Sequence, residues 1–541
     1  MKRTTISLLA TATALAVVTG VAALTAPDGG AATEATAPAR LPVERSSLLC
    51  PAPSSSEVAE TAYTSFTPPG TAGDAKDGDV KDGDARAGDA KDGTAELKPS
   101  SAVLADPDTA PKKDDEAKKD GPKNGDAATG DGVKGAKKPA PGKPALALKE
   151  PGKPVAATAE GGQAPALVGT ATGRLAPGWT TQQTTTVTAG GSRGLLGVSC
   201  TGPDTDFWFP GASTAEDRQD YVHLTNPDDT AAVADIELYG KDGALKTTLA
   251  EGIPVPAGSS VPVLLSTLTA AEPAADVTVH VTTRTGRVGA VVRAADDKAG
   301  SDWMTASADP AGTAVLPGIP ADATSVRLVA FAPGDDDADL KVQLAGAGRR
   351  ITPAGHETLH VKSGMTASVD LLDVTKGEAG SLILSPAQDG RATPVVAALR
   401  VVRGKGDKQE VAFIPATAPV GARATAADNR AKGSTLSLTA PGATARVKVT
   451  ASAGTGGGTQ VVKTYTVKSG TTLAVTPPVP AGLKGSYALT VETESGGPVH
   501  ASRMLALPQD GIPMFTVQTL PDDRGTVAVP EAEQDLSVLD D

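Results

Sequence analysis

The turn Val255-Pro-Ala-Gly258 returns as Val361-Lys-Ser-Gly364 and again as Val467-Lys-Ser-Gly470, each time 106 residues further along the chain. An apolar, strand-like run follows each turn. Self-similarity at a fixed long period indicates a domain that has been copied in tandem. The repeat therefore predicts several copies of one domain, and a local motif has to be interpreted in the context of that repeated scaffold.

The amino-acid sequence around these turns predicts short β-strands. Residues 234–239, 339–344 and 446–450 alternate apolar and polar side chains, as in a sheet with one solvated face. The last strand of each copy carries an aromatic residue, namely Trp303, Phe413 or Phe515. About seven short strands per ~100 residues indicate an all-β fold, and we predict tandem β-sandwiches of immunoglobulin or fibronectin-III type.

Composition divides the chain of 541 residues into segments. Residues 67–157 are rich in Asp, Lys, Gly and Pro with almost no bulky apolar side chain, so burial cannot offset their ordering entropy. We expect an export segment at 1–26, a first β domain split between 27–66 and 158–214, a disordered insertion at 67–157, sandwich repeats at 215–314, 315–420 and 421–520, and a disordered acidic tail at 521–541. We expect the sandwiches to form a rod.

The N-terminus has the pattern of an export signal. Lys2 and Arg3 precede an apolar stretch from Ile6 to Leu24, and no acidic residue occurs before Asp28. The stretch approaches the ~20 residues that span a bilayer, so it is either a cleaved signal peptide or an uncleaved anchor. We expect the rest of the chain to lie outside the cytoplasm, in the cell envelope or the extracellular space, and to meet the membrane only through this segment.

The chain has two cysteines, Cys50 and Cys200, and they bracket the charged insertion. Each ends a short apolar run that is typical of a strand. In an exported protein the favoured prediction is a Cys50–Cys200 disulfide that ties together the two halves of the first domain. Two unpaired core thiols are the alternative. In the chain-entropy model, closing so long a loop contributes ~4–5 kcal/mol.

Charge and composition exclude some functions. A net charge of −13 argues against nucleic acid as a partner, because phosphate binding needs clustered Lys and Arg. The five histidines and two cysteines form no catalytic constellation in the sequence. We therefore predict that the protein is not an enzyme, and that it has no catalytic residue, no cofactor and no metal.

The segment His356-Glu-Thr-Leu-His360 matches the zinc-protease motif H-E-x-x-H. That chemistry needs a helix, which places both imidazoles on one face. The equivalent segment of the next copy, 462–466, alternates like a strand, and residues four apart in a strand are ~13 Å apart. We interpret the motif as solvent-facing strand residues, with a zinc hydrolase as a remote alternative.

Other local motifs also have structural explanations. Gly190-Gly-Ser192-Arg-Gly194 matches a nucleophile elbow, but strands flank it on both sides, so we expect a hairpin turn. The acid-rich turns 226–229 and 334–339 could hold calcium, although the third copy has no acid there and solvated Asx turns are expected. Three arginines recur at matching strand ends and fit either a ligand-facing row or cross-strand pairing; they are Arg293, Arg400 and Arg503.

Several short motifs carry a family resemblance. They are Val43-Glu-Arg-Ser-Ser-Leu-Leu-Cys50-Pro, Gly197-Val-Ser-Cys200, Phe207-Trp-Phe-Pro-Gly211 and Asp302-Trp303. With these motifs the chain resembles a family of uncharacterised secreted or membrane-anchored proteins from high-GC actinobacteria, assigned to a domain of unknown function. The resemblance covers roughly residues 40–66 and 163–520. It implies an envelope location and no site residues.

Together these observations predict a non-enzymatic cell-envelope protein that acts as a scaffold or a binding module. The alternative is a module that binds cell-wall glycan. The expected partner is accordingly an envelope protein or a wall glycan.

Overall fold

The computed structural model describes residues 39–70, 93–102, 143–248, 251–388 and 391–529. The predicted export segment lies outside them, as do residues 530–541. The described chain is all-β, with two 3₁₀ turns and no α-helix, which confirms the predicted fold class. No helix in these described ranges is long and apolar enough to cross a membrane.

The described residues belong to two units. The smaller unit contains a two-stranded antiparallel ribbon of β1 (Ala39–Pro42) and β39 (Thr526–Val529). Residues 526–529 were predicted to be part of a disordered tail, so that prediction is wrong for this strand. The larger unit runs from Val43 to Gly525 and contains four β-sandwiches, each with its own apolar core.

The first sandwich packs the sheet β2-β8-β4-β6 on the sheet β10-β9-β3-β7. In chain order its strands are β2 (Arg45–Cys50), β3 (Ala59–Phe66), β4 (Ala95–Pro99), β6 (Leu146–Leu148), β7 (Val155–Glu160), β8 (Leu167–Thr172), β9 (Thr180–Val187) and β10 (Gly194–Ser199). The halves on either side of the charged segment therefore form one domain, as the sequence predicts.

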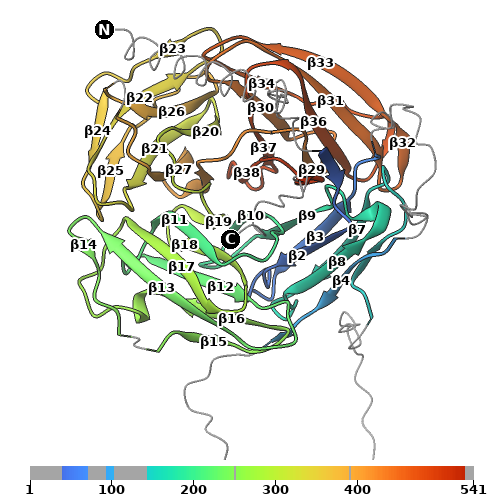
Figure 1. Ribbon diagram of the computed structural model, residues 1–541, viewed down its shortest axis with the longest axis horizontal. Coiled ribbons are helices and arrows are strands. Elements are labelled where there is room, and N and C mark those ends of the chain that lie inside the picture. Colours follow the sequence, from blue (N-terminus) through green and yellow to red (C-terminus); the bar gives the residue numbers. More distant parts are fainter. Residues whose placement is uncertain (1–38, 71–92, 103–142, 249–250, 389–390, 530–541) are drawn as a thin grey trace, which may run out of the picture. The chain divides into compact units, whose positions relative to one another are not determined.

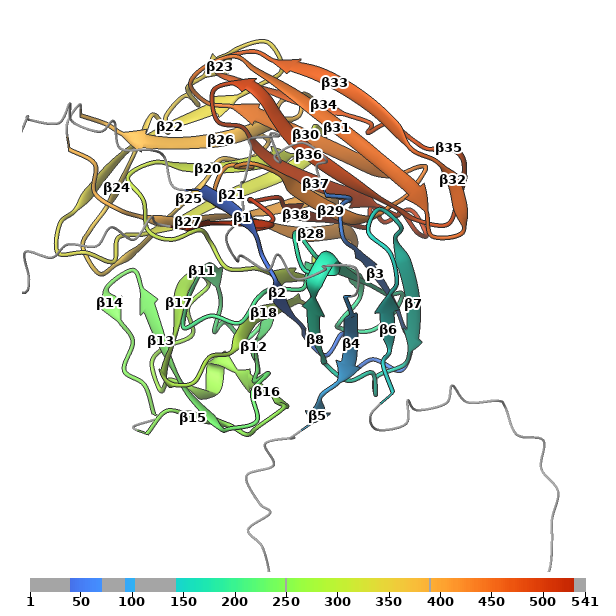
Figure 2. The same ribbon diagram turned by 45° about the vertical axis from the view of Figure 1, so that its right-hand side comes forward.

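The predicted insertion at 67–157 is not one continuous structureless segment. Strands β4 and β6 and the start of β7 lie inside it, because Ala95, Leu97, Leu146 and Leu148 are buried in the first core. The short strand β5 (Ser101–Ala102) pairs with β16 of the second sandwich (Figure 2). The prediction was wrong for these strands because a few alternating apolar residues suffice to form a strand of three to five residues.

The other three sandwiches repeat the same plan, in the colour order green, yellow and orange of Figure 1. The second contains β11 (Asp206–Ala212), β12 (Arg218–Thr225), β13 (Ala232–Gly240), β14 (Gly243–Ala244), β15 (Ile253–Val255), β16 (Ser259–Leu264), β17 (Val277–Thr285), β18 (Gly289–Asp296) and β19 (Gly300–Met304).

The third sandwich contains β20 (Ala314–Ile319), β21 (Ala323–Phe331), β22 (Ala338–Ala345), β23 (Arg350–Ile351), β24 (Thr358–Val361), β25 (Thr366–Asp370), β26 (Gly380–Pro386), β27 (Val396–Lys405) and β28 (Lys408–Pro415). The fourth contains β29 (Ala424–Asn429), β30 (Ser434–Ala440), β31 (Ala445–Gly454), β32 (Gly457–Thr459), β33 (Val461–Val467), β34 (Thr471–Val475), β35 (Ala481–Lys484), β36 (Tyr487–Gly496), β37 (His500–Ala506) and β38 (Phe515–Thr519).

Strand pairing differs from the immunoglobulin order. In each sandwich the first strand (β2, β11, β20 or β29) lies beside β8, β17, β26 or β36. In an immunoglobulin constant domain the first strand lies instead in the same sheet as the second. One predicted boundary also moves, because β11 pairs with β17 and thus belongs to the second sandwich, not to the first domain that was predicted to extend to residue 214.

The sandwiches do not form the expected rod. The last strand of the first sandwich, β10, packs against β19 of the second and β38 of the fourth. Strand β28 of the third sandwich also packs against both β19 and β38. The four last strands therefore contact one another in a closed cycle, and the first and fourth sandwiches are neighbours although they are far apart in sequence.

Candidate functional site

The two cysteines form the predicted disulfide. Cys50 ends β2 and Cys200 follows β10, so the bond joins the first and the last strand of the first sandwich. Both residues are buried in the core of that sandwich. The closed loop spans a sequence separation of 150 residues, which corresponds to a contribution of about 5 kcal/mol in the chain-entropy model.

The zinc-protease-like motif lies at the start of a strand and not on a helix. His356 and Glu357 precede β24, and His360 lies within β24 with Nδ1 2.8 Å from a carboxylate oxygen of Asp339. The prediction of strand residues is confirmed for residues 358–360. Within the described ranges, no group of three or more His, Cys, Asp or Glu side chains is arranged to hold a metal ion.

The other motifs fall in turns. Residues 190–193 connect the antiparallel pair β9 and β10, which confirms the predicted hairpin around Ser192. In the acid-rich turn 226–229, the side-chain oxygen of Asn226 accepts a hydrogen bond from the Asp228 N–H at 2.9 Å. Asp228 also pairs with Arg287 at 3.0 Å. This first acid-rich turn is therefore the expected Asx turn.

Two buried carboxyl groups lie where the four last strands meet. Asp302 in β19 accepts hydrogen bonds from the Gly197 N–H of β10 at 2.9 Å and from the Thr516 hydroxyl of β38 at 3.1 Å. Glu410 in β28 accepts a hydrogen bond from the Leu195 N–H of β10 at 2.8 Å. The two acids thus fasten strand β10 from two other sandwiches. We call Asp302 and Glu410 the hub carboxyls.

Burial decides the protonation of the hub carboxyls. It raises the pKa of Glu410 to about 8, against the opposing effects of the Leu195 N–H and of Arg193, which pairs with Glu410 at 3.1 Å. Burial also raises the pKa of Asp302 well above its ordinary value, and the nearby Glu410 adds to the shift. Removing a charged carboxylate from water is costly, so burial shifts the protonation equilibrium of both acids toward the neutral form.

The three recurrent arginines have different partners. Arg400 reaches from the third sandwich to Asp296 of the second at 2.6 Å. Arg503 is fully buried and reaches from the fourth sandwich to the Gln182 side chain of the first. Arg293 instead stays within its own sandwich, 5.2 Å above the ring of Tyr221. Arg400 and Arg503 therefore each join two sandwiches. Burial lowers the pKa of Arg503 to about 10.

A bulge in the first strand of a sandwich makes a further contact with the next one. Register shifts occur at Pro210/Ala212, Pro317/Ile319 and Ala426/Asn429. The bulges contain residues in the left-handed region, with φ of 95° at Gly211, 92° at Gly318 and 55° at Asp428. In the fourth sandwich the carboxylate of Asp428 accepts a hydrogen bond from Thr184 of the first sandwich at 2.7 Å. This bond is one of the contacts that join the fourth sandwich to the first.

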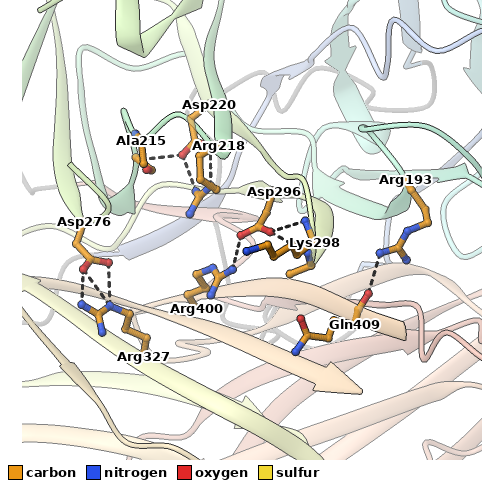
Figure 3. Close-up of polar contacts among 12 residues, drawn as sticks. Arg193, Ala215, Arg218, Asp220, Asp276, Asp296, Lys298, Arg327, Arg400 and Gln409 are labelled. Atoms are coloured by element: carbon orange, nitrogen blue, oxygen red, sulfur yellow. Dashed lines mark hydrogen bonds and ion pairs between the residues drawn. The ribbon is translucent and has the colours of Figure 1, made fainter. Parts of the chain in front are cut away.

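Ion pairs and aromatic rings fill the junction between the second and third sandwiches. Figure 3 shows Asp276 facing Arg327 and Asp296 facing Arg400, each pair at 2.6 Å. Beside them, Phe331 of the third sandwich lies 5.4 Å from the ring of Trp208 in the second. Removing one partner of a charged pair that is largely withdrawn from water strongly destabilises the folded protein. These ion pairs therefore stabilise the junction.

A pocket of about 390 Å³ lies in the second sandwich. Residues 214–221 form one wall and residues 264–273 the other. Arg218 lines the pocket, and Asp220 holds its guanidinium at 2.6 Å (Figure 3). The same guanidinium lies 5.6 Å above the Phe413 ring of the third sandwich, so the pocket adjoins the junction.

The sequence predicts the disulfide but none of the inter-sandwich acids. Asp302 belongs to the family motif Asp302-Trp303, and no motif in the sequence includes Glu410 or Asp428. The available signal was a charged residue beside buried aromatic or apolar ones, as in Asp302-Trp303 and Glu410-Val-Ala-Phe413. That signal alone does not reveal the partner strand.

Neither a curated protein nor a solved structure matches the chain. A family model does match, over residues 155–478, from β7 of the first sandwich to the loop after β34 of the fourth. This match covers more than half of the chain, and the protein therefore belongs to DUF5719, a family of unknown function.

Proposed function

We propose that this protein is an exported, non-enzymatic protein of the cell envelope that acts as a rigid scaffold for a binding partner. The export signal pattern at residues 1–26 supports an extracytoplasmic location. The Cys50–Cys200 disulfide is compatible with it, because disulfides persist in oxidising compartments.

The observation that carries the scaffold role is the contact between the first and fourth sandwiches. Because Asp428 binds Thr184 and Arg503 binds Gln182, the end of the repeat array is fixed to its beginning. Loops on such a frame keep constant mutual positions, which lowers the entropic cost of binding a partner. An open chain of domains on flexible linkers would lack this property.

Crosslinking in intact cells tests the proposal. An affinity tag placed between residues 103 and 142 leaves every described strand intact. Accessibility of the tag to added protease reports on export, and mass spectrometry after crosslinking identifies partners. The matched variants are Asp428→Ala, which weakens the closure, and Asp335→Ala, which removes an exposed acid of the third sandwich.

We expect protease to remove the tag from intact cells, and one or a few envelope proteins to be captured by the wild type and by Asp335→Ala. Capture should fall in Asp428→Ala, in which the first and fourth sandwiches are less firmly held. A tag protected inside the cell would contradict export. Capture of background proteins alone, or equal capture by all three forms, would contradict the scaffold role.

A wall glycan is the second candidate partner. The pocket of the second sandwich favours it, because hydroxyl groups and a tyrosine ring line that pocket.

A further inference from the structure

The pocket of the second sandwich has the dimensions and the groups of a ligand site. Its volume of about 390 Å³ lies within the range of ~300–1,000 Å³ that is typical of small-molecule sites. One wall is the connection from β11 into β12, and the other is the end of β16 with the 3₁₀ turn η2 (Leu265–Thr267) and the loop after it. The uncharged polar residues of the lining are Thr214, Gln219, Tyr221, Ser266 and Thr269.

The charges around the pocket are balanced. Asp220 accepts hydrogen bonds from Nε and Nη2 of Arg218 at 3.0 and 2.6 Å, so the guanidinium is neutralised by a buried carboxylate. Glu216 is the one other charged residue in the lining. Arg400, which lies near Asp220, is paired with Asp296. Among the residues that line the pocket, the positive charge of Arg218 is therefore paired, and no other cation is available there to select a phosphate or a carboxylate.

Donors remain available to an uncharged ligand. Within the described residues, Nη1 of Arg218 makes no hydrogen bond to the protein, and neither do the hydroxyls of Ser266 and Tyr221. Ser266 and Gln219 are exposed, and Tyr221 is half-buried. A hydroxyl can both donate and accept a hydrogen bond, and a guanidinium only donates.

The ring of Tyr221 provides an apolar surface beside these groups. Arg293 lies 5.2 Å from the ring centre, and the β12–β16 register places Leu264 opposite Tyr221. Arg293 thus covers one face of the ring, and Leu264 on the neighbouring strand also lines the pocket. Tyrosine combines an apolar body with a polar tip, and a pyranose or furanose ring likewise has apolar C–H faces and a polar rim.

We propose that this pocket binds one residue of a neutral saccharide. A C–H face of the sugar packs on Tyr221, while its hydroxyls bind Nη1 of Arg218 and the side chains of Gln219 and Ser266. This proposal deepens the proposed binding function by naming a ligand class, and it is tested separately from the protein partner.

Ligand-observed NMR on the purified full chain tests the saccharide site. The neutral probes are oligosaccharides of glucose, galactose, mannose, arabinose and N-acetylglucosamine, and the charged probes are inorganic phosphate and glucuronate. The pocket variants are Tyr221→Ala, which removes the ring, and Ser266→Trp, which fills the pocket from an exposed position. Asp217→Ala is the matched control, because Asp217 is exposed and adjacent but not part of the lining.

We expect one of the neutral oligosaccharides to bind, with affinity reduced about tenfold in Tyr221→Ala and abolished in Ser266→Trp. Asp217→Ala should bind like the wild type. Because Ser266 is exposed on a short turn, Ser266→Trp tests the site even if Tyr221→Ala fails to fold. The proposal is overturned if no neutral probe binds, if only the charged probes bind, or if Ser266→Trp binds as well as the wild type. Capture of a protein partner that survives Ser266→Trp would leave the scaffold role intact while the saccharide site fails.

Discussion

At the scale of single residues, the hub carboxyls couple the stability of this protein to pH. Burial raises the pKa of Glu410 to about 8 and raises that of Asp302. A group whose pKa is higher in the folded than in the unfolded state stabilises the fold in its protonated form. The stabilisation is complete below the unfolded pKa, about 4.3 for Glu, and is lost as the pH rises through the folded value.

We therefore expect the free energy of unfolding to fall between about pH 5 and pH 8, by about 1.4 kcal/mol per pH unit for each group that titrates there. Glu410→Gln keeps an oxygen for the Leu195 N–H but cannot ionise. The slope of its free energy of unfolding against pH should therefore be smaller by the contribution of one proton, about 1.4 kcal/mol per pH unit. Urea unfolding at four pH values measures the slopes, with Asp335→Asn as an exposed-acid control. Equal slopes in the wild type and Glu410→Gln would show that Glu410 is already ionised in the folded protein.

At the scale of elements, the bulges of the first strands set how closely neighbouring sandwiches approach. A Cβ on Gly318 would lie 2.1 Å from the hydroxyl oxygen of Ser502 in the fourth sandwich. A Cβ on Gly211 would meet Val329 of the third sandwich at an ordinary 3.5 Å. Both positions have positive φ, so the two glycines differ mainly in the space that the next sandwich leaves.

Alanine substitution separates the cost of a left-handed backbone conformation from the cost of a clash with the next sandwich. Gly211→Ala should cost about 1–2 kcal/mol, the penalty of a left-handed conformation. Gly318→Ala should cost more, about 3 kcal/mol in total, since a clash is added to the same penalty. Ser502→Ala in the Gly318→Ala background should restore part of the loss. Urea midpoints give the differences, and equal costs at the two positions would mean that the junctions are looser than described.

How far the elements could be predicted depends on what each part of the sequence encodes. Tandem sandwiches could be predicted from the 106-residue repeat and from the alternation of apolar and polar side chains in β13, β22 and β31. This was possible because such alternation depends only on the residues of the strand itself. Strands β4 and β6 escaped prediction because two buried residues each, Ala95 with Leu97 and Leu146 with Leu148, are too few to stand out in charged text. The roles of Glu410 and Asp428 also escaped, because their partners lie more than 200 residues away.

At the scale of the whole molecule, the disulfide and the closed cycle act on different parts of the fold. The disulfide joins the ends of the first sandwich, so its loss should lower the free energy of unfolding by about 5 kcal/mol. Unfolding of the wild type with and without reductant measures this difference. Cys50→Ser/Cys200→Ser should be as unstable as the reduced protein and should not respond to reductant; a response would reveal an effect of the reductant elsewhere.

The closed cycle should make residues 43–525 unfold as one unit. Each sandwich shares part of its packing with two neighbours, so none can open without loss to the others. Calorimetry should show one transition with equal calorimetric and van't Hoff enthalpies. Arg503→Met combined with Asp428→Ala removes two of the polar links between the first and fourth sandwiches and should split the transition. A wild type that already unfolds in several steps would contradict this coupling.

The bond from Asp428 to Thr184 also has a consequence for biosynthesis. Thr184 is made early, and its partner emerges 244 residues later. Domains generally fold in order as the chain is synthesised. The surface of the first sandwich that packs on the fourth therefore stays exposed until the last copy is complete. The nascent chain is therefore prone to aggregate for most of its synthesis. A product truncated within the final repeat would keep this surface of the first sandwich exposed.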